Sequence, residues 1–208
     1  MCKRPIVGIT MGDPAGIGPE VAAKALARNA VWRCCRALVI GDAGVMIEAV
    51  KLVEMAATVH AIANPAAADF ELGVLDVLDL ATVDLAALRP GRVSASAGRA
   101  AVDYVEKATE LAQHGDVNAV VTGPINKAAL RAAGIPHIGH TELLASLTGQ
   151  ERATTMLTTP GLRVTHVTRH VPLAAVAPLI TRERVLSTIR ATNTGLKDLG
   201  TARPRLAV

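Results

Sequence analysis

The stretch "GITMGDPAGIGPEV", residues 8–21, holds four glycines, two prolines and two carboxylates directly behind a short apolar run. Gly18-Pro19-Glu20 predicts the start of a helix, because proline at the first helical position leaves no amide unpaired and an acidic side chain complements the helix dipole. The dinucleotide fingerprint would need a glycine in place of Val21, so that motif is excluded. The stretch therefore predicts a strand, a tight turn and a helix. Two interpretations stay open: a purely structural turn, or backbone that approaches a ligand at a strand end.

The same alternation of short apolar runs and helical patterns continues along the chain. Buried strands rich in β-branched residues are predicted at 6–10, 37–41, 59–62, 119–121 and 205–208, with a possible further strand at 73–80. Helices are predicted at about 19–28, 43–56, 96–113, 125–133, 142–148 and 182–199. Strands that alternate with helices indicate an α/β fold with a largely parallel sheet.

Two segments depart from this alternation. The β-type runs on either side of Pro160-Gly161 predict an antiparallel hairpin, an arm or an edge, within 154–168, because that dipeptide suits a type II turn. The final "PRLAV" (204–208) looks like a buried strand without a flanking loop. We therefore expect the sequence to stop inside a larger fold.

Composition narrows the functional classes. The net charge is only +4, lysines and arginines are scattered, and Trp32, Phe70 and Tyr104 are the only aromatic residues. Nucleic-acid binding is not expected, because neither a basic stripe nor a set of stacking rings is present. No run approaches the ~20 apolar residues of a membrane span. The three cysteines form no disulfide framework, which favours a reducing, cytoplasmic location.

Polar residues that could bind a ligand follow two glycine-containing turns. Lys127 lies in the first turn of a predicted helix, where the dipole disfavours a cation by roughly 0.3–1 kcal/mol. Beside free helix amides it could hold a phosphate, although a lysine that simply reaches solvent remains an alternative. His140 and Thr141, in "GHTELLA" (139–145), could hydrogen-bond a polar substrate. Equally, Thr141 could cap a helix, with His140 incidental.

The remaining histidines are assigned by position. If His166 and His170 lie on one strand they share a face but stand ~13 Å apart. Metal–nitrogen bonds of ~2.0–2.1 Å then prevent both from holding one ion. His170, before Pro172, has the better position for a ligand. His60 and His114 are predicted to be ordinary surface residues.

Four segments together resemble the 4-hydroxythreonine-4-phosphate dehydrogenase family of pyridoxal phosphate biosynthesis. They are "GITMGDPAGIGPEV", "VVTGPINKAAL", "GHTELLA" and "TRHVPL", and they occur in the family's order over essentially the whole chain. The resemblance implies the three-layer α/β sheet of isocitrate and isopropylmalate dehydrogenases. Residues 1–208 would form one incomplete unit of that type, with the C-terminal cofactor-binding part missing.

The resemblance also implies a reaction. In such enzymes a divalent metal (zinc, magnesium or cobalt) holds the substrate hydroxyl, NAD accepts the hydride, and the β-keto acid loses carbon dioxide. By motif, His170 is a metal ligand, His140 and Thr141 contact the substrate, and Lys127 is a catalytic residue near the same pocket. The family acts as a homodimer with the metal site across the interface. No cofactor-binding residue is assigned.

The sequence departs from the family pattern at its end. Family members continue into two further segments that each supply a metal histidine, so activity of this chain is in question. Alternatives are a dehydrogenase of a phosphorylated sugar acid such as threonate or erythronate 4-phosphate, a dihydrodiol dehydrogenase, or a non-catalytic remnant that binds anions or an intact homologue. An acyl- or phosphotransferase on a similar fold is a weaker third class.

Overall fold

The structure is a computed structural model that describes residues 4–137, 139–150 and 153–208. The chain divides into two compact units, residues 1–151 and 152–208. The first unit contains a five-stranded sheet. The second contains a two-stranded sheet and a long helix near the C-terminus. Among the described residues, no helix combines the length and the apolar character needed to cross a membrane.

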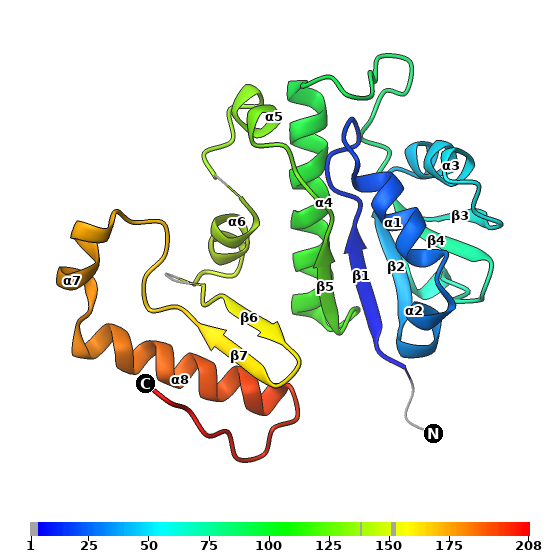
Figure 1. The fold of residues 1–208 in the computed structure, drawn as a ribbon. Coiled ribbons are helices and arrows are strands. Elements are labelled where there is room, and N and C mark those ends of the chain that lie inside the picture. The colour runs from blue at the N-terminus through cyan, green and yellow to red at the C-terminus, as the bar shows by residue number, and fades with distance from the viewer. Residues whose placement is uncertain (1–3, 138, 151–152) are drawn as a thin grey trace. The chain divides into compact units, whose positions relative to one another are not determined.

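The five strands of the first unit are all parallel and stand in the order β3-β4-β2-β1-β5. Their bounds are β1 Ile6–Thr10, β2 Arg36–Gly41, β3 Thr58–Ile62, β4 Val74–Asp79 and β5 Ala119–Thr122 (Figure 1). These strands confirm the predictions at 6–10, 37–41, 59–62 and 119–121 and the possible strand at 73–80. The two edge strands, β3 and β5, are less buried than predicted, since each has exposed residues. The prediction of an α/β fold with a largely parallel sheet is therefore confirmed for this unit.

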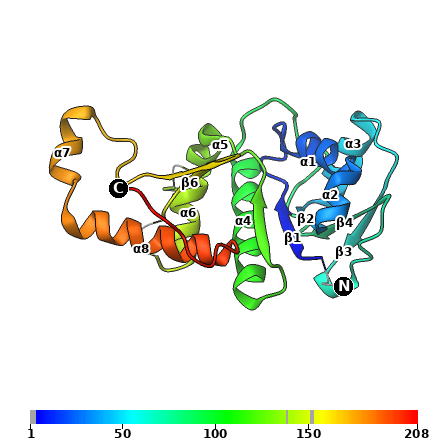
Figure 2. The same ribbon diagram turned by 60° about the horizontal axis from the view of Figure 1, so that its bottom comes forward.

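Helices cover both faces of this sheet. Helices α1 (Gly18–Leu26) and α3 (Ala43–Leu52) pack together on one face, and α4 (Ala95–His114) packs on the other (Figures 1 and 2). Connections between parallel strands are almost always right-handed, so the direction in which the chain steps across the sheet decides which face the connecting helix covers. The step from β1 to β2 and the step from β4 to β5 run in opposite directions across the sheet, so their helices cover opposite faces. The core between the layers consists mainly of alanine, valine, leucine and isoleucine.

Short elements complete the first unit. Helix α2 (Asn29–Cys34) was not predicted; it buries Trp32, whose Nε1 donates to the carbonyl of Leu26 at 2.6 Å. The 3₁₀ turn η1 (Pro65–Ala67) lies between β3 and β4, and helices α5 (Lys127–Ala132) and α6 (His140–Leu147) follow β5.

A buried polar network joins α4 to the end of β2. The hydroxyl of Tyr104, fully buried, donates to Asp42 Oδ2, and Thr82 Oγ1 donates to the same oxygen at 2.8 Å. The amide of Val83 donates to Asp42 Oδ1 at 2.9 Å. Burial, followed by the bond to Asp42, raises the pKa of Tyr104. The network fixes the loop after β4 to the carboxyl end of β2.

We expect Tyr104→Phe to lower the free energy of unfolding by about 1.5 kcal/mol, the net value of a hydrogen bond to a charged group. The ring still fills its space, and Thr82 and Val83 still donate to Asp42, so no larger cavity or isolated charge arises. Urea unfolding of the variant and the wild type measures the difference. A loss below about 0.5 kcal/mol would show that the phenolic bond contributes little.

The second unit has a hairpin and a long helix. Strands β6 (Met156–Thr159) and β7 (Leu162–Thr165) pair antiparallel, and Gly161 adopts φ +81, as the third position of a type II turn requires. The 3₁₀ turn η2 (Leu173–Ala175) and helix α7 (Val176–Leu179) lead into α8 (Arg182–Asp198). Thr181 caps α8 by accepting a bond from the amide of Arg184.

The strand predicted at 205–208 is wrong. These residues form no regular element, and Val208 is 91% exposed. A strand needs a neighbour that satisfies its backbone groups, and no described strand pairs with this segment. Instead, residues 204–207 line an open cavity of about 790 Å³ beside the hairpin and α8.

Candidate functional site

The loop quoted at the start of the sequence packs against the loop that follows β5. Gly12 has φ +78, and a Cβ atom at this position would collide with the carbonyl oxygen of Pro124. The amide of Asp13 donates to that same oxygen at 2.9 Å, and the amide of Gly123 donates to the carbonyl of Thr10 at 2.9 Å. The glycines therefore allow two backbones to approach closely at the carboxyl ends of neighbouring strands.

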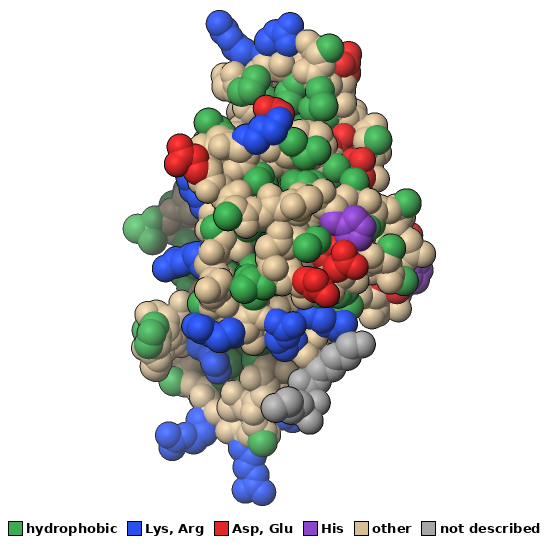
Figure 3. Space-filling view, turned by 90° about the vertical axis from the view of Figure 1, so that its right-hand side faces the viewer, with side chains coloured by type: hydrophobic (Ala, Val, Ile, Leu, Met, Phe, Trp, Pro, Cys, Tyr) green, Lys and Arg blue, Asp and Glu red, His purple; other side chains and the backbone are tan. Residues whose placement is uncertain are grey.

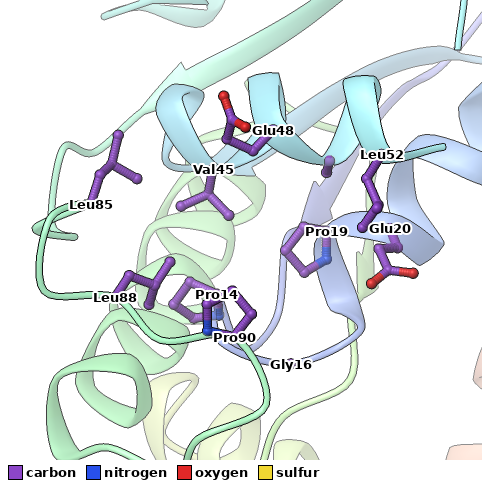
Figure 4. Close-up of a pocket in the computed structure, with 11 residues that line it drawn as sticks. Pro14, Gly16, Pro19, Glu20, Val45, Glu48, Leu52, Leu85, Leu88 and Pro90 are labelled. Carbon is purple, nitrogen blue, oxygen red and sulfur yellow. The ribbon is translucent and has the colours of Figure 1, made fainter. Parts of the chain in front are cut away.

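On its other side the opening loop lines an apolar cavity of about 410 Å³. Figure 4 shows Pro14, Gly16 and Pro19 on one wall, with side chains of α3 and of the loop after β4 around them. Its only charged lining residues are Glu20 and Glu48, which pair with Lys24 and Lys51 of their own helices. Without a basic lining residue, this cavity does not suit a phosphate group.

Lys127 is exposed at the first position of α5. The side chain of Asn126 caps this helix and accepts bonds from the amides of Ala128 and Ala129, at 2.9 and 3.3 Å. The expectation of free helix amides beside Lys127 is therefore wrong for these two groups. The positive charge that could attract an anion here is the ammonium group of Lys127.

Helices α5 and α6 are held against α4 by a small apolar cluster and one close contact. Val102 and Val105 of α4 pack with Leu130 of α5 and Leu143 of α6. Gly98 of α4 faces the backbone of Ala129, where a Cβ atom would collide with the carbonyl oxygen. The two segments that carry Lys127 and His140 are thus fixed to the same helix.

His140 begins α6 and lies half-buried. Its Nε2 atom is buried and has no hydrogen-bond partner among the residues that the structure describes. Burial lowers the pKa of His140, and a hydrogen bond with the backbone of Gly123 opposes this change. The imidazole therefore lies next to the loop that leads to Lys127.

Thr141 is half-buried in the first turn of α6. The alternative that it caps the helix is wrong, because Gly139 occupies the N-cap position and no side chain bonds to the helix start. Thr141 is therefore free of that structural task. Its assignment as a substrate contact stays a prediction.

We expect His140→Gln to reduce the loss of stability in mild acid. The folded-state pKa of His140 is lowered from its ordinary value of 6.5, so at pH values between the two the unfolded chain binds more protons. The wild type should thus lose stability as the pH falls from 6.5 towards the folded pKa, and gain nothing from His140 above 6.5. Urea unfolding between these limits measures the slope. His114→Gln, on the exposed end of α4, is the control and should keep a steeper slope than His140→Gln.

His166 and His170 do not share a strand. Strand β7 ends at Thr165, so the expectation that alternation places both on one face is wrong. His170 is exposed in a bend with φ +55, a conformation that residues other than glycine rarely adopt. Glu54, Phe70 and Ala81 also have positive φ, so this conformation by itself assigns no task to His170. It belongs to the second unit, whereas Lys127, His140 and Thr141 belong to the first.

The prediction for His60 as an ordinary surface residue is also wrong. His60 Nδ1 lies 2.8 Å from Oδ1 of the fully buried Asp76 and 3.2 Å from Oδ2 of Asp69. The sequence held one signal for this, since Asp76 interrupts the apolar run of β4 and a buried carboxylate needs partners.

Comparison with known proteins shows the family of the chain. The family model described as "Pyridoxal phosphate biosynthetic protein PdxA" matches residues 33–208. The chain belongs to the PdxA family. A crystal structure of a 4-hydroxythreonine-4-phosphate dehydrogenase from Burkholderia phymatum superposes with a TM-score of 0.92 at 42% identity, covering 97% of this chain and 61% of that one. The resemblance found from the four sequence motifs is thereby confirmed.

Curated PdxA-like relatives carry two names. A putative D-threonate 4-phosphate dehydrogenase from Symbiobacterium thermophilum is 49% identical over all of this chain and 62% of its own length. A 4-hydroxythreonine-4-phosphate dehydrogenase from Desulforapulum autotrophicum is 40% identical over 99% of this chain and 61% of its own length. The chain thus spans about 62% of the length of the curated PdxA relatives it matches.

Proposed function

We propose that the chain carries the substrate-binding part of an NAD-dependent dehydrogenase that acts on a 4-phosphorylated, four-carbon hydroxy acid. The observation that carries this proposal is the buried Nε2 of His140, which has no partner among the described residues and lies beside the loop leading to Lys127. A side-chain movement at this site would expose the atom to a substrate. A neutral imidazole can accept or donate one hydrogen bond to a substrate hydroxyl or carboxylate. The lysine supplies the charge that a phosphate needs.

D-Threonate 4-phosphate is the first candidate substrate. It is favoured by the 49% identity with the relative from Symbiobacterium thermophilum. 4-Hydroxythreonine 4-phosphate is the second, because the relative from Desulforapulum autotrophicum and the crystal structure from Burkholderia phymatum carry that name. The two differ at C2, where the first has a hydroxyl group and the second an amino group. Lys127 would bind the phosphate that both share.

The proposed cofactors are NAD and a divalent metal. When bound, NAD accepts the hydride from the substrate carbon and the metal stabilises negative charge on oxygen. The described residues contain no group of three metal-ligating side chains around His170. One imidazole alone holds a divalent ion weakly. His170 is therefore proposed as a single ligand, and we derive no reaction step through the metal.

The proposal also covers the oligomeric state and the particular type of α/β sheet. By the family resemblance, we propose a homodimer and the sheet type of isocitrate and isopropylmalate dehydrogenases. The exposed apolar side chains of the hairpin, Leu157, Leu162 and Val164, would suit a surface buried between two copies.

The experiment that tests the function measures binding and turnover separately. Isothermal titration calorimetry with each 4-phosphorylated acid should give binding of D-threonate 4-phosphate, and weaker binding in His140→Ala. NADH formation is then followed with zinc, magnesium or cobalt added, using protein whose intact mass is verified. Turnover supports the dehydrogenase, and binding without turnover supports the non-catalytic alternative. Failure of both acids to bind would contradict the proposal.

A further inference from the structure

The side chains of β3 and β4 place a set of metal-ligating atoms on the outer edge of the sheet. His60 and Asp76 are direct neighbours in the register of these parallel strands. Asp69, from the loop between the strands, completes the set, and one ligating atom of each residue lies within 4.8 Å of the others. Figure 3 shows this side of the molecule, where acidic side chains gather beside a histidine.

Asp76 organises this group from inside the fold. It is fully buried and accepts bonds from the amides of Asp69 at 3.1 Å and Phe70 at 2.8 Å. These bonds hold the loop so that the Asp69 carboxylate turns back towards His60. The side chains of His60 and Asp69 are 37% and 54% exposed, so the group opens to solvent on one side.

The charge of this group is unbalanced. His60 Nδ1 carries at most one proton, yet two carboxylate oxygens face it. Within the part of the chain that the structure describes, neither Asp69 nor Asp76 forms an ion pair with a lysine or an arginine. The neighbouring Arg36 is engaged elsewhere: its guanidinium lies over the ring of Phe70, and its Nε donates to the carbonyl of Arg4.

We propose that His60, Asp69 and Asp76 bind a first-row divalent metal ion such as Zn²⁺. In tetrahedral geometry, bonds of ~2.0–2.2 Å from zinc to nitrogen and oxygen separate neighbouring donors by about 3.3–3.6 Å. The separations of 2.8 and 3.2 Å from His60 Nδ1 would widen by several tenths of an ångström. The two carboxylates, whose ligating atoms lie within 4.8 Å of each other, would close onto the ion. The ion would replace the proton on Nδ1 and neutralise both carboxylates, and the exposed side would leave a position for water. It would tie the loop at residues 63–73 to the edge strand.

This site is independent of the proposed dehydrogenase function and of His170. The test therefore starts from His170→Ala protein, freed of metal by a chelator, and titrates it with Zn²⁺ in a calorimeter. His60→Ala and Asp69→Asn remove one ligand each from exposed or half-exposed positions, whereas Asp76 is left unchanged because its loss would disturb the buried loop anchor. His114→Ala, an exposed histidine at the end of α4, is the matched control.

We expect one equivalent of Zn²⁺ to bind to the His170→Ala protein and to the His114→Ala control in the same background. His60→Ala and Asp69→Asn should each weaken that affinity by at least about tenfold. Zinc should also raise the melting temperature of the first protein but not of the His60→Ala variant, since a ligand of the folded state stabilises it. Equal zinc binding with and without His60 would overturn the proposal. So would Mg²⁺ that binds as tightly as Zn²⁺ regardless of His60, because that is the behaviour of a merely acidic surface.

Discussion

Gly12→Ala should lower the free energy of unfolding by more than about 3 kcal/mol, the range reserved for backbone strain and severe overpacking. Two effects add at this position. Gly12 has φ +78, which disfavours any residue with a Cβ atom, and that atom would collide with the carbonyl oxygen of Pro124. Because the obstacle is backbone, relief requires the loops after β1 and β5 to separate. Urea unfolding, or loss of soluble folded protein, measures the effect.

Gly115→Ala is the matched control for this prediction. Gly115 has φ +83 at the end of α4, but no atom lies within 4 Å of a Cβ built there. Its replacement should cost only the left-handed conformation, about 1–2 kcal/mol. Equal losses in the two variants would mean that the contact between the two loops is not tight.

Lys127→Ala should weaken the binding of D-threonate 4-phosphate by about ten- to a hundredfold, since a hydrogen bond to a charged group contributes about 1.5–3 kcal/mol. The free protein should not lose stability. Removal of a cation from the first turn of α5 is expected to leave it unchanged or more stable by about 0.3–1 kcal/mol. Calorimetric titration and urea unfolding together separate a binding role from a structural one.

Lys51→Ala provides the comparison, because Lys51 is an exposed lysine of the same unit that pairs with Glu48. It should leave the affinity for the phosphorylated acid within about twofold, since surface charges at a distance are largely screened by salt. If both lysine variants weakened binding alike, the effect would be one of net charge, and the assignment of Lys127 would be wrong.

The first unit could largely be predicted from local sequence. Its strands are apolar runs between glycines and polar turns, so composition marks them without knowledge of the fold. Composition does not reveal which strands lie at the edge, and β5 has exposed residues there. Helix α2 was missed because Arg28, at its N-cap, offers no capping bond and six residues show no clear periodicity. The segment 205–208 has the composition of a strand, yet strand formation depends on a partner that composition does not reveal.

The candidate site was only partly predictable for the same reason. Motifs singled out Lys127, His140 and Thr141, because each follows a glycine-containing turn after a strand or at a helix entry; their roles stay predictions. The burial of His140 Nε2 and the use of Asn126 as a helix cap depend on how α5 and α6 pack on α4. The contacts of His60 depend on which strands are neighbours, and the pattern of residues does not show that β3 pairs with β4 across the loop at residues 63–73.

The absence of a side chain at Gly98 affects how rigidly α5, the helix that carries Lys127, is held. At Gly98 the backbone of α5 is in direct contact with the backbone of α4. The position of α5 is therefore fixed by contact between two main chains, which cannot adjust as side chains can. Under the proposed function, a phosphorylated molecule that reaches Lys127 would thus meet a lysine on a helix that is already in place. Only the four-carbon stem of the lysine has to become ordered on association, which keeps the entropic penalty to about 0.5–1.5 kcal/mol for that side chain.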